Sequence, residues 1–242
     1  TEDGRFVKSE KFNKPTPAEI AYWGGYFFYH NRLHRNYQDD ISLHYYLLAS
    51  KDGITIGKRY FKHENNKEDY PFSPSGHNLY DNNSKLYYCR DFDNIVYQIH
   101  EDSVVPRFRI NLPNPLPASM IEERPNEMSL LRSGYSLGIT DIYEYGGLLF
   151  FRFVKDGYIW SCLYNVEESK QVYCAKRIKF LDSSLIDTID GIYKDCFYSI
   201  LTPEYLDYAF SENPLEDYPD LFKTYDVEGD NPVIAFYRAV VR

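Results

Sequence analysis

The stretch that decides the fold is KLYYCRDFDNIVYQIHEDSVVPRFRINL, residues 85–112. It contains three short runs of β-branched and aromatic residues, at positions 86–89, 95–99 and 104–110, separated by polar segments. Such runs between turn-forming residues are typical of antiparallel strands joined as hairpins. The segment DFDN at residues 91–94 is expected to be a turn, because no glycine and glutamate follow it at the spacing of a calcium-binding loop.

Similar units flank this stretch on both sides. The letters IAYWGGYFFY at residues 20–29 match IYEYGGLLFF at residues 142–151. Equivalent segments recur at intervals of roughly 50 to 60 residues, the size of a four-stranded propeller blade. The expected strand groups are residues 19–61, 77–111, 137–180 and 185–241, with residues 4–8 as a lone outer strand. A two-sheet sandwich is the competing all-β interpretation, although it does not require four similar units in series.

The sequence therefore predicts an all-β protein, a β-propeller of four-stranded antiparallel blades, with residues 1–242 as a single domain or fragment. About sixteen strands are expected, whereas six blades of four strands need about twenty-four. Two arrangements fit this number. Either further residues upstream supply two blades, or the strand at residues 4–8 completes the last group and four blades close as they stand.

Composition and charge exclude several classes of function. A net charge of −9 and a pI near 5.2 argue against a nucleic-acid partner, which needs a basic face. No apolar run approaches the roughly 18 residues of a membrane helix. The first residues, TEDG, lack the basic start and apolar stretch of a signal peptide. No cofactor is predicted, and no P-loop, Rossmann or G-x-S-x-G motif is present.

Two Gly-Gly pairs mark predicted hairpin turns. Gly24–Gly25 and Gly146–Gly147 are each expected to turn the chain with positive φ for at least one glycine. Replacing Gly147 with Val should then destabilise the fold by about 1 kcal/mol or more. Thr202 and Pro203 predict the N-cap and first position of a helix that reaches residue 210. Residues 118–132 can hold one or two helical turns.

The four cysteines are expected to be small buried hydrophobic residues, because none forms a CxxC pair. Cys162 and Cys174 lie on the two arms of one hairpin, so they are expected to face each other. Free thiols are nevertheless predicted, since directly paired strand positions rarely give relaxed disulfide geometry.

Long polar segments are expected to gather on one face of the propeller. Residues 30–40, 62–76, 113–134 and 202–230 all fall in second-turn or inter-blade positions, and long loops on a rigid scaffold commonly carry function. Residues 30–40 are the richest in usable groups: two arginines to clamp an anion, two histidines of a type that titrates near neutral pH and a tyrosine to stack. The predicted ligand-binding residues are Arg32, His34, Arg35 and Tyr37; a solvated loop without a partner is the alternative.

Catalytic and metal sites are not predicted. His30 and His34 have the spacing of a helical metal site, but Asn31 stands where the zinc-protease motif needs glutamate. Carboxylate pairs for glycoside hydrolysis remain an alternative. The available carboxylates are Asp39, Asp40, Glu122, Glu123 and Asp190.

Two motifs carry a family resemblance: LYYCRDFDNIVYQI at residues 86–99 followed by VPRFRI at residues 105–110, and DNPVIAFY at residues 230–237. They resemble the six-bladed β-propeller proteins common in Bacteroides-type bacteria, and the similarity spans most of the chain. The resemblance implies an exported protein of the periplasm or cell envelope, often a lipoprotein, of unassigned function. It supplies no catalytic residues. The glycine-rich N-terminal segment and lipoprotein cysteine of that family are not found in this sequence.

These observations favour an exported module that binds a protein or carbohydrate ligand on a propeller scaffold. A propeller hydrolase or lyase acting on polysaccharide is the alternative. Carboxylates that converge within roughly 5 to 10 Å of each other would favour the enzyme.

Overall fold

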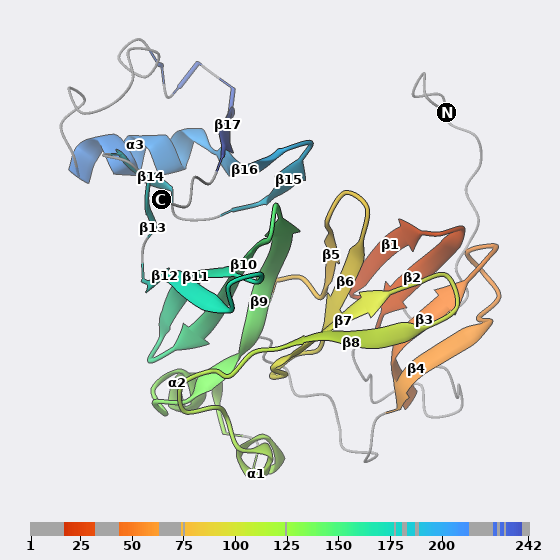
Figure 1. Ribbon diagram of the computed structural model, residues 1–242. Helices are drawn as coiled ribbons and strands as arrows, with labels where there is room; N and C mark the ends of the chain where they lie inside the picture. Colours follow the sequence, from red (N-terminus) through yellow and green to blue (C-terminus); the bar gives the residue numbers. More distant parts are fainter. Residues whose placement is uncertain are drawn as a thin grey trace. The chain divides into compact units, whose positions relative to one another are not determined.

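The computed structural model describes residues 17–31, 44–62, 74, 76–123, 125–176, 178–180, 183–186, 189–212, 225–226, 228–229 and 231–238. The chain divides into two compact units, Thr1–Pro71 and Phe72–Arg242. In both units the described elements are mainly antiparallel strands (Figure 1). The expected all-β class is therefore confirmed.

The first unit contains a four-stranded antiparallel sheet. Its strands, paired in chain order, are β1 (Glu19–Trp23), β2 (Tyr26–His30), β3 (Tyr45–Ser50) and β4 (Lys58–Lys62). Phe28, Leu47 and Ala49 are buried on one face of this sheet, as the two-residue period of a strand requires. Gly24 and Gly25 have φ of 55° and 79°, so the predicted glycine turn between β1 and β2 is confirmed.

The second unit contains two four-stranded sheets, a three-stranded sheet and a two-stranded hairpin among its described residues. The first sheet is β5 (Leu79–Asp81), β6 (Leu86–Cys89), β7 (Ile95–Ile99) and β8 (Val104–Arg109). The next is β9 (Ser136–Tyr145), β10 (Leu148–Lys155), β11 (Tyr158–Asn165) and β12 (Lys170–Ala175). The three-stranded sheet is β15 (Gly191–Tyr193), β16 (Cys196–Leu201) and β17 (Val233–Tyr237). The three strands expected within residues 85–112 are confirmed as β6, β7 and β8.

The two-stranded hairpin corrects the sequence prediction. The predicted strand groups at residues 137–180 and 185–241 assign the segments on either side of residues 181–184 to different groups. Instead β13 (Ile178–Phe180) pairs with β14 (Ser183–Ile186), and Phe180 lies opposite Ser183. Asp182 and Ser183 are residue types that favour turns, so the sequence carries a signal for a chain reversal after Phe180.

Among the described residues, three helices lie between the strands. The connection from β8 to β9 contains α1 (Ala118–Glu122) and α2 (Glu127–Leu131), as expected. The helix α3 (Pro203–Glu212) follows β16, and Tyr205 N donates to Thr202 Oγ1 at 3.3 Å. The predicted N-cap is therefore confirmed. Leu206 and Ala209 of α3 pack against Leu201 of β16.

The inner strands of the β9–β12 sheet, β9 and β10, are covered on both faces. Adjacent strand residues point to opposite faces, and Glu144 and Tyr145 contact different neighbours. The Glu144 carboxylate accepts a hydrogen bond from Arg107 of β8 at 3.1 Å, whereas the Tyr145 ring meets Phe197 of β16 edge-on, with 6.3 Å between centroids. The sheets β5–β8, β9–β12 and β15–β17 are therefore stacked face to face in chain order. Their first strands meet at the centre of the stack, where β9 contacts both β5 and β15.

A close backbone approach holds β9 against the turn between β6 and β7. Ile139 N donates to Asp93 O at 3.1 Å. A Cβ placed on Gly138 would lie 2.7 Å from Phe92 Cα, and Gly138 has φ of 104°. Only glycine fits such a contact without backbone movement. Asp93 also accepts from Arg90 at 2.6 Å, which supports the interpretation of residues 91–94 as a turn.

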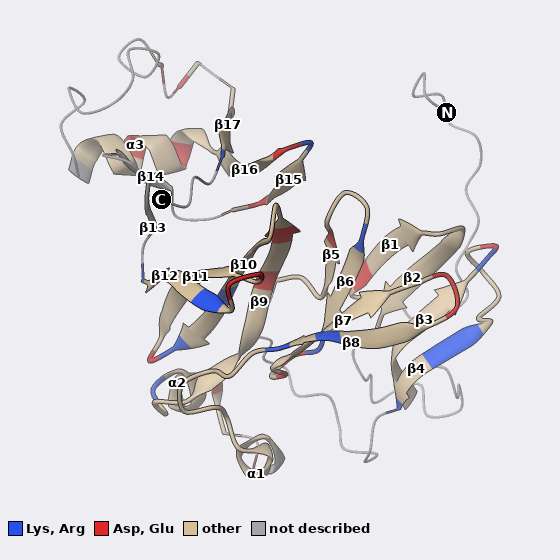
Figure 2. Cartoon of the chain, in the orientation of Figure 1, with Lys and Arg blue, Asp and Glu red and all other residues tan. Residues whose placement is uncertain are grey.

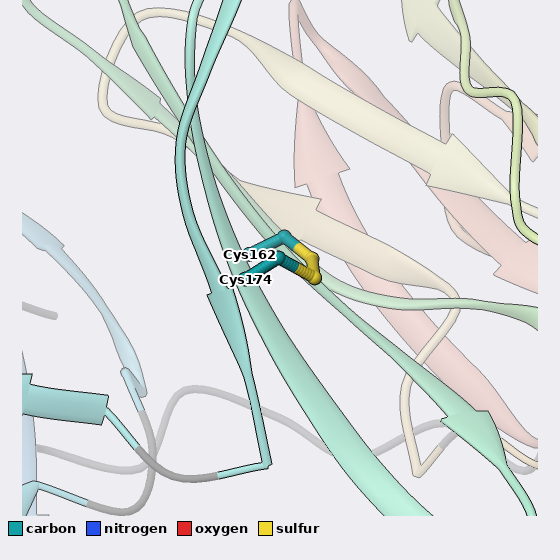
Figure 3. Close-up of a disulfide and its surroundings, with 2 residues drawn as sticks. All are labelled: Cys162 and Cys174. Atoms are coloured by element: carbon teal, nitrogen blue, oxygen red, sulfur yellow. A yellow bond between two sulfur atoms is a disulfide. The ribbon is translucent and has the colours of Figure 1, made fainter.

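A disulfide joins Cys162 of β11 to Cys174 of β12 (Figure 3). The sequence placed the two residues opposite each other correctly, but the prediction of free thiols was wrong. They are direct register partners with Cα atoms 4.1 Å apart, the close approach of a non-hydrogen-bonded antiparallel pair. At that separation the two sulfur atoms come within bonding reach. Cys89 and Cys196 are free.

Candidate functional site

Three hairpin turns of the second unit meet around an open hollow of about 380 Å³. These turns join β5 to β6, β9 to β10 and β15 to β16. The lining residues are Asn82, Asn83, Ser84, Lys85, Glu144, Tyr145, Gly146, Gly147 and Lys194. We call this site the turn hollow. Most of these residues have polar side chains, which can form hydrogen bonds with a small hydrophilic ligand.

Asn82 fixes the β5–β6 turn to β9. Its amide nitrogen donates to the carbonyl oxygens of Tyr80 and Ile142, both at 3.1 Å, and its oxygen accepts from Glu144 N at 2.6 Å. The Asn82 side chain is buried, so it satisfies backbone groups that would otherwise lack partners. The wall that Asn82 and Glu144 form is therefore held in place by the fold itself.

Glu144 is the centre of a charged network. Its carboxylate accepts from Lys85 Nζ at 2.8 Å, from Arg107 at 3.1 Å and from the Tyr87 hydroxyl. Burial alone would raise the pKa of Glu144, but the hydrogen bonds from Lys85 and Tyr87 and the nearby positive charges outweigh it and lower the pKa. Burial and the hydrogen bond to Glu144 raise the pKa of the Tyr87 hydroxyl. Glu144 is therefore a fixed anion that orients its donors.

A hydrogen bond joins the β5–β6 turn to the β15–β16 turn. Asn83 Nδ2 donates to Lys194 O at 3.1 Å. Both residues have positive φ, 59° at Asn83 and 54° at Lys194, a conformation that asparagine tolerates better than most residues. At the second turn, Gly146 and Gly147 have φ of 58° and 75°, which confirms the predicted glycine turn. A Cβ at Gly146 would meet open space, so the backbone there is accessible.

The turn hollow is locally basic on an acidic protein. Two lysines and one glutamate line it, and Arg107 also neutralises that glutamate. The chain as a whole has a net charge of −9. Figure 2 shows basic and acidic colour together at the tip of the β15–β16 hairpin. The lining would thus attract an anionic group.

Metal binding has little support at this site. Within the described ranges of the chain, no group of three or more His, Cys, Asp or Glu side chains is arranged to hold a metal ion. The turn hollow has one carboxylate, and three donors already engage it.

Comparison with known proteins gives a family and a fold. A family described as "Domain of unknown function (DUF4934)" matches residues 1–238. The chain belongs to the DUF4934 family. No protein of curated function matches it. A crystal structure of a "putative exported protein" from Bacteroides fragilis superposes with a TM-score of 0.66 at 15% identity, covering 87% of this chain and 61% of that one.

That structural neighbour supports the all-β architecture of this DUF4934 chain. The chain spans about three-fifths of the neighbour's length, since 61% of the neighbour is covered. In the part of the chain that the structure describes, no helix has the length and apolarity to cross a bilayer.

The predicted ligand-binding residues of this DUF4934 chain, Arg32, His34, Arg35 and Tyr37, lie outside the described residues. That assignment stays a prediction. His30, the other histidine of the motif, ends β2 and is buried. The turn hollow is formed instead by short turns of the second unit, none of which belongs to the long polar segments that were predicted to carry function.

The residues of the turn hollow were missed for an identifiable reason. They come from turns far apart in sequence; Asn83 and Lys194, for example, are separated by 111 positions. One signal was available: each turn follows the first strand of its repeat. Aligning the repeats would have placed residues 82–85, 145–147 and 194 together.

Proposed function

We propose that this chain is an exported binding module on a β-propeller scaffold, with the turn hollow as its ligand site. The observation that carries the proposal is the hollow itself: three turns, each fixed to a neighbour by hydrogen bonds, surround a space of about 380 Å³ into which several polar side chains converge. Pockets of several hundred Å³ with convergent polar groups are the usual sites for small ligands.

Export is supported by the Cys162–Cys174 disulfide. Disulfides form and persist in oxidising compartments and are rare in a reducing cytosol. The name of the Bacteroides fragilis neighbour, which refers to export, agrees with this assignment. The periplasm or cell envelope is the proposed compartment.

The propeller assignment is supported by the stacking in the second unit. Successive antiparallel sheets pack face to face, and the first strands of neighbouring sheets are in contact, β5 with β9 and β9 with β15. A radial succession of four-stranded sheets around their first strands is the architecture of a propeller. We extend the proposal to residues 1–242 as one propeller domain.

Binding is favoured over hydrolysis by the state of Glu144. Glycoside hydrolysis needs a pair of carboxyl groups, one to transfer a proton and the other to act as base or nucleophile. Glu144 is the carboxylate in the lining, and Lys85, Tyr87 and Arg107 all donate to it. A carboxylate with three donors and a lowered pKa is a poor proton donor.

The test is a thermal-shift screen with acidic and neutral sugars, sugar acids, amino acids and short peptides. A compound that binds the native state raises the unfolding midpoint. Ser84→Trp should abolish that rise, because Ser84 is exposed in the lining and an indole there fills the hollow. The matched control is Ser119→Trp on α1, where Ser119 is also exposed.

The same screen separates the two candidate sites. A compound whose effect survives Ser84→Trp but is lost when Arg32, His34, Arg35 and Tyr37 are all changed to Ala binds at residues 30–40. A compound that no longer raises the unfolding midpoint in Ser84→Trp alone binds the turn hollow. If no compound shifts the wild-type midpoint, the binding assignment is wrong.

A further inference from the structure

We infer that the turn hollow selects a small carboxylate ligand that also carries hydroxyl groups, such as a sugar acid. This inference rests on the proposed binding function and adds the chemical class of the ligand. Three features of the lining support it: two lysines, neutral hydrogen-bonding groups beside them, and an aromatic ring next to exposed backbone.

The two lysines supply the charge. Lys85 has three N–H donors, one of which donates to Glu144 at 2.8 Å, and its side chain is about one-third exposed. Lys194 lies over the Tyr193 ring, with Nζ 5.2 Å from the ring centroid. A carboxylate in the hollow can therefore accept from both ammonium groups. Because Glu144 is shared with Arg107, the glutamate does not cancel the positive charge of the lysines.

The neutral groups suit hydroxyls. Asn83 uses its side-chain nitrogen on Lys194 O, which leaves its oxygen as an acceptor in the lining. The Ser84 hydroxyl can both donate and accept. Hydroxyl groups of a ligand need such mixed partners, whereas a purely apolar acid would leave these groups unpaired on binding.

The remaining wall fits a ring-shaped ligand. Tyr145 is partly exposed and is held edge-on by Phe197, so its ring is available as a rigid apolar surface. Apolar ring faces of aromatic residues pack against the C–H faces of other rings. Gly146 follows without a side chain, and a Cβ there would meet open space, so a ligand can reach the backbone of the turn.

The experiment compares charged and neutral versions of one skeleton. Isothermal titration would measure glucuronate and gluconate against glucose and glucitol, with inorganic phosphate as a separate arm. We expect at least one acid to bind about tenfold or more tightly than its neutral counterpart. Lys194→Met should weaken the binding of that acid about tenfold, and Lys85→Arg should retain binding. Lys170→Met, an exposed lysine of β12 outside the lining, is the control.

The outcomes separate the ligand class from the binding function. If neutral compounds bind as tightly as acids and Lys194→Met has no effect, but Ser84→Trp still abolishes binding, the sugar-acid assignment is overturned while the binding module stands. Binding of phosphate in preference to every carboxylate overturns it in favour of a phosphate site. If no probe binds the wild type, both proposals fail.

Discussion

The β9–β12 and β15–β17 sheets have similar residue types but different surroundings. Both are rich in Tyr, Phe, Ile and Leu. The inner strands of the β9–β12 sheet, β9 and β10, are buried on both faces, with Phe150 on one and Leu149 on the other. The β15–β17 sheet buries Phe197 and Leu201 on one face, whereas Ile200, Ile234 and Phe236 on the other are 47%, 55% and 53% exposed. The residue types therefore explain why these segments form strands, whereas the neighbouring sheets determine which faces of the strands are buried.

The largest test of this comparison uses two phenylalanines of one sheet. Phe197 is 1% exposed and packs against Tyr145, so Phe197→Ala should cost about 3–5 kcal/mol through lost burial and the cavity left behind. Phe236→Ala on the other face should change stability by only about 0.5 kcal/mol. Urea unfolding of both variants measures the difference. Equal losses would show that the Phe236 face is also covered.

The second test concerns the backbone contact that positions β9. Gly138→Ala should cost about 3 kcal/mol, because the added Cβ meets Phe92 backbone at 2.7 Å and the residue must keep a φ of 104°. Gly146→Ala is the matched control. It also has positive φ but adds its Cβ to open space, so about 1 kcal/mol is expected. If the two variants lose the same amount, the Phe92 contact does not constrain β9.

The third test concerns the covalent link in the β9–β12 sheet. The Cys162–Cys174 bond closes a loop with a sequence separation of 12. By loop-closure entropy its removal should cost about 2–3 kcal/mol. Denaturant unfolding with and without reductant measures this loss, and the double variant Cys162→Ala/Cys174→Ala should no longer respond to reductant. A wild type insensitive to complete reduction would contradict the expectation. Cys196→Ala, in the β15–β17 sheet, controls for a free thiol.

What the sequence predicts well in this chain is local. The glycine turns, the Thr202 cap and the strands at residues 86–110 depend on residues next to one another, and all agree with the structure. The pairing of Cys162 with Cys174 could also be predicted, because the register of one hairpin sets it. The disulfide could not be predicted, since it depends on the distance between the two Cα atoms, which the register alone does not give.

What the sequence predicts poorly is the assembly of distant turns. The turn hollow depends on bonds such as those from Asn82 to Ile142 and from Asn83 to Lys194, which span 60 and 111 positions. Neither turn shows a ligand motif by itself. Likewise, the alternation in β16 and β17 indicates two faces but not which of them a neighbour covers.

The smallest test concerns the charge network between β9 and the β5–β8 sheet. The lowered pKa of Glu144 means that its ionised form stabilises the fold. That contribution is present above the unfolded pKa and is lost as pH falls through the folded pKa. Glu144→Gln should therefore be less stable than wild type by about 1–2 kcal/mol at pH 7, a value kept modest because Lys85 and Arg107 are partly exposed to solvent.

The pH dependence distinguishes this charge effect from a change in packing. As the pH falls through the lowered pKa of Glu144, its carboxylate becomes protonated, so the two proteins should converge in stability. Urea unfolding from pH 3 to 8 measures that convergence. A difference that stays constant over this range would assign the loss to packing of the glutamine rather than to charge. Glu123→Gln on the exposed surface is the control, and it should follow the wild type at every pH.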